Sequence, residues 1–284
     1  MIRQRFTTLL LAIFCFALVA LAQTTPGPVA TEAQPLSVSE VKFDPYLPGE
    51  KLKYVGKYKK LGFSFAIAEI DFQVGDSGTD GFYNVFTEGR SKGTLAKLFN
   101  FKFTMNIDSR IDGQKFQIEK TTKLDKQGER VRESEAEFDY QSRRVTFTET
   151  DPKDPTRAPR RVASRIGPDT QDMVSAVYRL RGLDLAVGKR FTFKVSDSGL
   201  VYDIPVVVAK REMIKSKLGK RWCFRIEPEV FGEGMFIEQK GDLVIWITDD
   251  VDRVPVLAEV ETQWGDVKIK LREYSNLRSS VAAK

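Results

Sequence analysis

The stretch Phe99-Asn100-Phe101-Lys102-Phe103-Thr104-Met105-Asn106-Ile107 decides the fold class of this chain. Its odd-numbered residues are large and apolar, whereas its even-numbered residues are polar. Because successive side chains of a strand point to opposite faces of a sheet, this alternation predicts a strand with one buried and one wet face. Asp112-Gly113 comes next and predicts a two-residue hairpin turn, after which residues 115–124 predict the strand that pairs back.

The same alternation recurs between turn signals along the rest of the chain. Further strands are predicted around residues 63–67, 83–85, 145–147, 191–195, 243–247, 255–264 and 267–271. Gly265-Asp266 supplies a second tight-hairpin signal between the last two. Short connections between consecutive strands favour an antiparallel meander over crossover helices.

Residues 168–181 depart from this pattern and predict one substantial helix, at about 169–181. Its apolar residues recur at i, i+4 and i+7: Met173, Val177 and Leu180. Asp169 or Thr170 would cap the N-terminus, and Gly182 stands where a C-terminal cap would fall. The predicted fold is therefore mainly β, a single large curved antiparallel sheet or a partly open barrel or sandwich, with this helix laid on a sheet face.

The N-terminal sequence predicts an export signal. Arg3 and Arg5 precede an almost wholly apolar run at 9–21, and Ala20-Leu21-Ala22 supplies the small residues that a signal peptidase reads. We expect a signal peptide at 1–22 that is cleaved after Ala22, which places the protein in the periplasm with no transmembrane span after cleavage. An uncleaved N-terminal anchor is the alternative, although the apolar run is short for a membrane span.

The rest of the chain divides into three parts. Residues 23–42 show no periodicity and predict a disordered leader. A single β-rich domain is predicted at 43–277, followed by a C-terminal tail at 278–284. The proline-rich segment 151–159 predicts a loop that divides the strands into two sets of this one domain.

The charge balance argues against a nucleic-acid partner. The 284 residues carry a formal net charge of +6. Removal of Arg3 and Arg5 with the signal peptide would leave 43 basic and 39 acidic residues. A surplus this small fits a mixed surface with a mild attraction to anionic lipid, and it is not the footprint of a nucleic-acid-binding protein.

Residue types that support catalysis are scarce. The chain has no histidine, and Cys223 is the only cysteine outside the predicted signal peptide. These absences remove the usual general base, histidine-based nucleophilic systems and thiolate metal sites, so we expect no enzyme, no cofactor and no metal. Asp249, Asp250 and Asp252 form a dense acidic cluster between two strands, where aspartates favour turns. Hydrolysis of a glycan by such paired carboxylates is the remaining catalytic alternative.

Two groups of residues suggest binding. The first is apolar and would line a concave sheet that holds a lipid or other hydrophobic ligand: Phe63, Phe65, Phe99, Phe101, Phe103 and Met105. The simpler interpretation is that these are core residues, because alternation reports burial and not an empty cavity. The second group is basic and could meet anionic head groups, or simply solvate loops: Arg157, Arg160, Arg161, Arg165, Lys215, Lys217, Lys220 and Arg221.

Three segments carry a resemblance to a known family. They are Pro48-Gly49-Glu50 with Leu52 and Tyr54, the helical set Asp172, Ser175, Tyr178 and Arg181, and Trp246-Ile247-Thr248-Asp249-Asp250 followed by Arg253-Val254-Pro255-Val256. In these segments the chain resembles the bacterial envelope family called domain of unknown function 3108, over about residues 43–277. The resemblance implies a periplasmic β-rich protein and supplies no catalytic residues.

Two functional hypotheses remain open. The first is a periplasmic protein that binds a lipid or other hydrophobic ligand in the concave sheet. The alternative is a non-enzymatic structural or interaction module of the envelope, with a filled core and another envelope protein as its partner.

Overall fold

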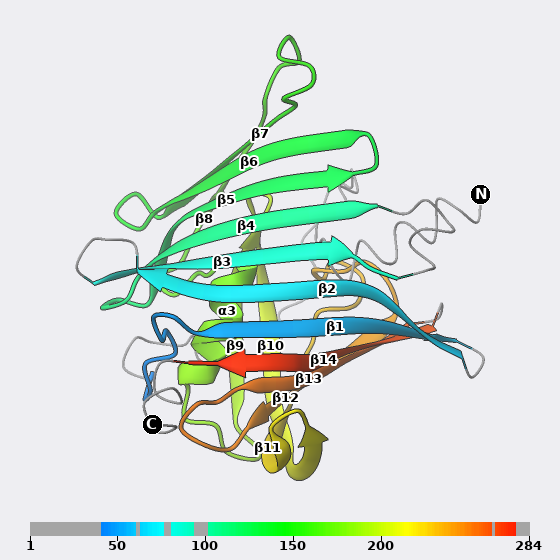
Figure 1. Cartoon of the computed structure of the whole chain (residues 1–284). Coiled ribbons are helices and arrows are strands. Elements are labelled where there is room, and N and C mark those ends of the chain that lie inside the picture. The colour runs from blue at the N-terminus through cyan, green and yellow to red at the C-terminus, as the bar shows by residue number, and fades with distance from the viewer. Residues whose placement is uncertain (1–40, 61–62, 77–80, 94–101, 263–264, 277–284) are drawn as a thin grey trace.

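The computed structural model describes residues 41–60, 63–76, 81–93, 102–262 and 265–276. Within these ranges, fourteen strands form one sheet in which neighbouring strands run antiparallel (Figure 1). This confirms the predicted fold class. The predicted signal peptide, the leader up to residue 40 and the predicted C-terminal tail lie outside the described residues.

The strands fall into two consecutive sets. The first set is β1 (Lys51–Lys60), β2 (Phe63–Asp76), β3 (Phe82–Ser91), β4 (Phe103–Asp112), β5 (Gln117–Gln127), β6 (Arg130–Asp139), β7 (Arg144–Thr150) and β8 (Arg160–Arg165). The second set is β9 (Arg190–Asp197), β10 (Leu200–Ser216), β11 (Gly219–Pro228), β12 (Gly241–Thr248), β13 (Pro255–Thr262) and β14 (Gly265–Ser275). The helix α3 (Met173–Gly182) lies between the two sets in the chain.

Each set is a simple meander, and the two meanders are joined side by side through β1 and β14. The edge strands β8 and β9 are not hydrogen-bonded to each other, so the sheet does not close into a barrel. Its two ends overlap instead, because the β9–β10 turn packs against β7 and β8. At Gly199 in this turn, an added Cβ would lie 2.7 Å from the Cβ of Phe147 and 2.8 Å from that of Val162.

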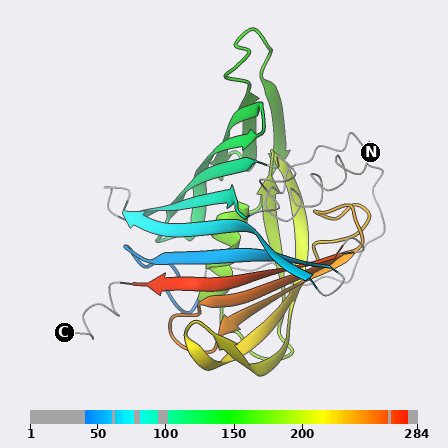
Figure 2. The ribbon, with the colours of Figure 1, turned by 45° about the vertical axis from the view of Figure 1, so that its right-hand side comes forward.

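The helix α3 lies against the inner face of the curved sheet, between the strands of both meanders (Figure 2). Val174 and Tyr178 pack with residues of the first meander, and Leu180 packs with residues of the second. Since β4 turns its buried odd-numbered residues toward this helix, its even-numbered residues face outward. Phe103, Met105 and Ile107 are accordingly buried, while Asn106 is exposed.

The ends of the helix differ from the prediction. Asp172 is the N-cap, in place of Asp169 or Thr170: its carboxylate accepts from the backbone N–H of Ser175, whose hydroxyl accepts from the N–H of Asp172. Gly182 is the last helical residue, not a cap beyond the helix. Its added Cβ would lie 2.9 Å from the carbonyl oxygen of Phe43, so close backbone packing explains this glycine.

Two predicted hairpins form with different turns. Asp112 pairs with Gln117, so four residues, 113–116, connect β4 and β5, and the left-handed position is Phe116 rather than Gly113. The carboxylate of Asp112 accepts from the N–H groups of Gln114 and Lys115, which stabilises this longer turn. Gly265 is the first residue of β14 and pairs with Thr262, so the predicted Gly265-Asp266 turn belongs to the strand.

The loop at 151–159 also has a different place from the predicted one. It connects β7 and β8, which are neighbours in the first meander, and forms the loop at the top of Figure 1. The division between the two strand sets falls at α3 instead. Charge and proline content identified a loop there, but they could not show which strands pair across it.

Candidate functional site

The four described residues of the predicted ligand site differ in their burial. Phe103 and Met105 are buried in the core, where Phe103 packs with Tyr58 and Ile67. Phe63 and Phe65 lie at the start of β2, with 66% and 42% of their surface exposed. Their rings stack on each other with centroids 6.3 Å apart.

The other two members of that set, Phe99 and Phe101, lie outside the described residues. Between α3 and the inner face of β5–β7 there is a cavity of only about 40 Å³. That is room for about one water molecule and not for an acyl chain. Binding of a hydrophobic ligand therefore stays a prediction. The inner face of the sheet beside the helix has no space for such a ligand.

The clearest buried polar feature is an ion pair between Glu50 and Arg181. Their side chains are 0% and 1% exposed, and both terminal nitrogens of the guanidinium donate to the carboxylate at 2.7 Å. Burial disfavours the charge on Arg181, but the hydrogen bonds and the charge of Glu50 outweigh burial and raise its pKa. The arginine also donates to the carbonyl oxygens of Asp252 at 3.0 Å and Arg253 at 3.1 Å.

This ion pair joins the three segments that carry the family resemblance. Glu50 precedes β1, Arg181 belongs to α3, and the two carbonyl groups belong to the loop between β12 and β13. Nearby, the hydroxyl of Tyr54 donates to the carbonyl oxygen of Pro255 at 2.8 Å, and the guanidinium lies 4.9 Å from the ring of Tyr178. Because both charged side chains are closed to solvent, the pair fixes the position of three segments and does not contact a ligand.

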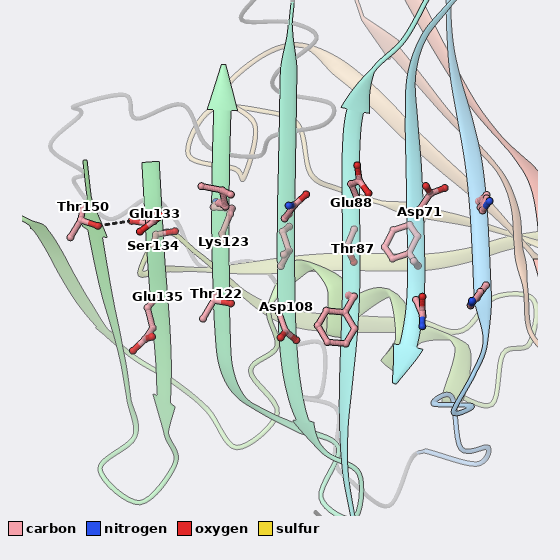
Figure 3. Close-up of a pocket in the computed structure, with 18 of the residues that line it drawn as sticks. Asp71, Thr87, Glu88, Asp108, Thr122, Lys123, Glu133, Ser134, Glu135 and Thr150 are labelled. Atoms are coloured by element: carbon pink, nitrogen blue, oxygen red, sulfur yellow. Dashed lines mark hydrogen bonds between the residues drawn. The ribbon is translucent and has the colours of Figure 1, made fainter. Parts of the chain in front are cut away.

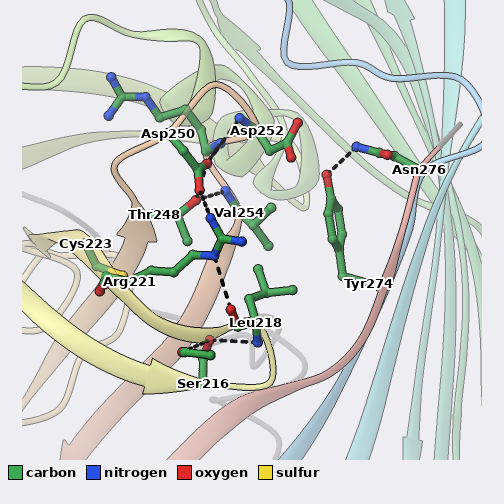
Figure 4. A network of polar contacts seen from close by, with 12 residues as sticks. Ser216, Leu218, Arg221, Cys223, Thr248, Asp250, Asp252, Val254, Tyr274 and Asn276 are labelled. Atoms are coloured by element: carbon green, nitrogen blue, oxygen red, sulfur yellow. Dashed lines mark hydrogen bonds and ion pairs between the residues drawn. The ribbon is translucent and has the colours of Figure 1, made fainter. Parts of the chain in front are cut away.

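The aspartate cluster at 249–252 is explained by turn chemistry (Figure 4). One carboxylate oxygen of Asp250 accepts from the hydroxyl of Thr248 at 2.8 Å and from the N–H groups of Asp252 and Arg253 at 3.2 Å. Asp249 pairs with Arg211 at 2.6 Å. Each of these contacts shapes the loop, so the arrangement does not present two free carboxylates to a substrate.

The thiol of Cys223 is fully buried on β11. Burial raises its pKa to about 11, and the neighbouring carboxylates of Asp250 and Asp249 act in the same direction. A thiol with such a pKa is almost entirely protonated near neutral pH and is a poor nucleophile. Cys223 therefore belongs to the core.

A hollow with a volume of about 1060 Å³ crosses the outer face of β1–β7 (Figure 3). The strand register brings its lining side chains into two parallel rows, one residue from each strand. The first row is Lys51, Gln73, Phe86, Asp108, Thr122, Glu135 and Thr148. The second row is Lys53, Asp71, Glu88, Asn106, Leu124, Glu133 and Thr150. We call this surface the outward groove.

The outward groove is acidic over most of its length. In these two rows both lysines lie on β1, whereas the five carboxylates lie on β2, β3, β4 and β6. Lys123 of β5 also lines the hollow and pairs with Asp197 at 3.6 Å. Arg90 pairs with Asp71 and with Glu88 at 3.2 Å, and Lys120 pairs with Glu135 at 2.6 Å. Asp108 and Glu133 have no cationic partner among the described residues, so the middle of the groove keeps uncompensated negative charge.

Asp108 lies in the first row of the groove, on β4. Burial raises its pKa above the ordinary value, although the amide of Asn84, which donates to it at 2.7 Å, acts in the opposite direction. Beside it in the same row, Phe86 is half-exposed. The groove thus offers an aromatic face next to a carboxylate whose charge lacks a partner, a setting that suits a cationic group.

The sequence did not identify this groove, although it correctly placed Asn106 on a wet face. Polar alternation on one strand shows only that one face is solvated. The alignment of polar positions over seven strands depends on the register, and the register depends on turns that the sequence misplaced by a few residues. The signal that could have pointed here is the run of acidic outward positions on successive strands.

Comparison with known proteins identifies the family. The model of a protein family of unknown function, DUF3108, matches residues 53–272. No curated protein matches the chain. A solved β-barrel-like protein of the domain of unknown function DUF1849 from Brucella abortus is similar, with a TM-score of 0.55 and 11% identity over 81% of this chain and 98% of that chain.

That identity is low, so the likeness shows a shared fold and nothing about activity. A second structure, of a protein from Bacteroides fragilis assigned as exported and as having a YmcC-like fold, covers 83% of this chain and 100% of that chain with 8% identity. Its TM-score of 0.35 is too low to indicate the same fold. Because the family model spans well over half of the sequence, the chain belongs to the DUF3108 family.

Proposed function

We propose that this protein is an exported, non-enzymatic interaction module of the cell envelope. In this proposal its outward groove binds an extended, positively charged segment of a partner protein. The observation that carries the proposal is the double row of side chains across β1–β7, acidic in its middle and open to solvent.

The dimensions of the groove favour an extended ligand. Seven strands about 4.8 Å apart give the rows a length of about 29 Å, which about nine residues of extended chain would span. The two ends differ in charge, since Lys51 and Lys53 lie at one end, the carboxylates lie between the ends, and Thr148 and Thr150 lie at the other end. A basic segment laid over Asp108 and Glu133 would neutralise carboxylates that lack a cationic partner among the described residues, which gives the interaction both affinity and direction.

Site-specific photocrosslinking in intact cells tests this proposal. We expect a photoreactive residue at Phe86 or Thr122 to capture a partner protein, whereas one at the exposed Lys270 on β14 should not. Neutralising the centre of the groove with Asp108→Asn and Glu133→Gln should reduce capture from Thr122. Glu129→Gln, which removes an exposed carboxylate from the β5–β6 turn, should leave it unchanged. Equal capture from Lys270, or none from the groove, would refute the proposal.

Export to the periplasm is part of the same proposal and rests on the N-terminal sequence. Arg3, Arg5 and the apolar run at 9–21 support recognition as a signal peptide. Among the described residues no helix combines the length and apolarity that crossing a membrane requires. N-terminal sequencing of protein recovered from the periplasm should begin at Gln23. A chain that retains residues 1–22 and sediments with membranes would indicate the uncleaved anchor instead.

A further inference from the structure

The hairpin of β10 and β11 presents an unusual combination of exposed side chains at its end. Met213 and Trp222 are 47% and 46% exposed. The strands connect through Lys217 and Leu218, and Gly219 follows with a positive φ of 85°. The opposite face of the hairpin is anchored, because Leu218 packs against the core together with Ile214.

The strand register gathers apolar and basic side chains on one face of this hairpin. Met213 lies directly opposite Trp222, and Lys215 lies directly opposite Lys220. Since these pairs are two residues apart on each strand, all four side chains project to the same side. The guanidinium of Arg211 lies 4.5 Å from the indole of Trp222, which holds the ring in place.

The three lysines at this end lack an ion-pair partner among the described residues. Lys215, Lys217 and Lys220 are exposed, and none of them forms an ion pair within the part of the chain that the structure describes. Two like charges directly opposite each other on a sheet repel and destabilise the pairing. An anionic surface placed over Lys215 and Lys220 would relieve this repulsion, so their arrangement favours binding more than folding.

A third exposed apolar residue lies on the adjoining loop. Val251 is exposed, and its loop is attached to the hairpin because the N–H of Asp249 donates to the carbonyl oxygen of Trp222 at 2.8 Å. Arg221 pairs with Asp250 in the same loop at 3.4 Å. The loop and the hairpin thus form one connected surface, and the hairpin lies at the lower end of the molecule in Figure 1.

We propose that this hairpin end docks onto the surface of a membrane that contains anionic phospholipid. Lysine ammonium groups would contact the head groups, while Trp222 and Met213 would enter the boundary between head groups and acyl chains, where amphipathic aromatic rings are favoured. An acidic glycan or a soluble acidic protein would satisfy the lysines alone. A bilayer surface satisfies the charges and the exposed apolar side chains together. The outward groove on β1–β7 lies on other strands and would stay open to a partner.

Vesicle flotation of the purified mature protein, which begins at Gln23, tests the proposal. We expect binding to vesicles of phosphatidylcholine with about 30% phosphatidylglycerol, weakening as salt rises, and little binding to phosphatidylcholine alone. Each lysine near the surface contributes about five-fold in partitioning, so Lys215→Gln with Lys220→Gln should lower it by roughly 25-fold. The matched pair Lys126→Gln with Lys240→Gln removes two exposed lysines elsewhere and should leave partitioning unchanged.

A second measurement locates the contact. Lipids with brominated acyl chains should quench the fluorescence of the wild-type protein, and the quenching should disappear in Trp222→Phe. Equal partitioning of the Lys215 and Lys220 variant, an equal loss in the control pair, or no binding to anionic vesicles would each overturn the proposal. Quenching that persists without Trp222 would overturn the assigned orientation and with it the proposed surface.

Discussion

At the scale of single residues, Glu50 and Arg181 make the strongest prediction about stability. A buried ion pair contributes little to stability compared with an apolar pair of the same shape. Removal of one partner, however, leaves the other as an unpaired charge in the core. Arg181→Met should therefore lower the free energy of unfolding by about 3–5 kcal/mol, measured by urea denaturation. The double variant Glu50→Leu with Arg181→Met should recover part of that loss.

The surface carboxylate of Asp184, which pairs with Lys42 and Lys189, is a suitable comparison, since all three side chains are about half-exposed. Asp184→Asn should lower the free energy of unfolding by less than about 1 kcal/mol, because water and salt screen exposed charges. If Arg181→Met cost no more than Asp184→Asn, the junction of the three segments would not depend on this pair.

Asp108 gives a prediction that depends on pH. Because burial raises its folded pKa above the ordinary value of 3.8, the folded state binds the proton more tightly than the unfolded state. The contribution of this group to stability is present below the unfolded pKa and is lost as pH rises through the folded pKa. Asp108→Asn should therefore become more stable relative to wild type between about pH 3 and about pH 7 in chemical unfolding. A difference between Asp108→Asn and wild type that stays flat over this pH range would contradict the prediction.

At the scale of elements, the two hairpin glycines Gly199 and Gly219 separate backbone strain from packing. Both have positive φ, at 82° and 85°. An added Cβ meets Phe147 and Val162 at Gly199, whereas it meets nothing within 4 Å at Gly219. Gly219→Ala should lower the free energy of unfolding by about 1–2 kcal/mol, because alanine is strained in the left-handed backbone conformation. Gly199→Ala should cost about 1–3 kcal/mol more in thermal or urea unfolding, because it forces the overlapping ends of the sheet apart. Equal costs would show that this overlap is loose.

The elements also show what the sequence could and could not predict. Alternation on β4 identified a strand and its buried face, because a side-chain period of two depends only on local geometry. The N-cap was misplaced by two or three residues, since Asp169, Thr170 and Asp172 are all suitable capping residues. Asp172 was selected by tertiary contacts: the hydroxyls of Ser109 and Thr121 both donate to its carboxylate.

The whole molecule shows where local patterns stop being informative. The pairing of β1 with β14, which joins the two meanders, connects residues more than 200 positions apart, and no local signal marks it. The outward groove has the same origin, because Phe86, Asp108 and Glu135 share a row only through the registers of four strands. The three segments that carry the family resemblance meet at Glu50 and Arg181, a contact that the resemblance by itself did not predict.

These long-range connections predict that the two meanders unfold together. Val174 and Tyr178 of α3 pack in the first meander and Leu180 packs in the second, while the β1–β14 pairing and the Glu50–Arg181 pair hold both to the same helix. All three tryptophans, Trp222, Trp246 and Trp264, belong to the second meander by sequence, and Trp246 packs against β1, so their fluorescence reports on that half and its junction with β1. Circular dichroism reports on the strands of both halves. We expect coincident midpoints from the two probes in urea, and Arg181→Met should shift both by the same amount. If the fluorescence transition preceded the loss of circular dichroism, the meanders would be separate folding units and α3 would belong energetically to only one of them.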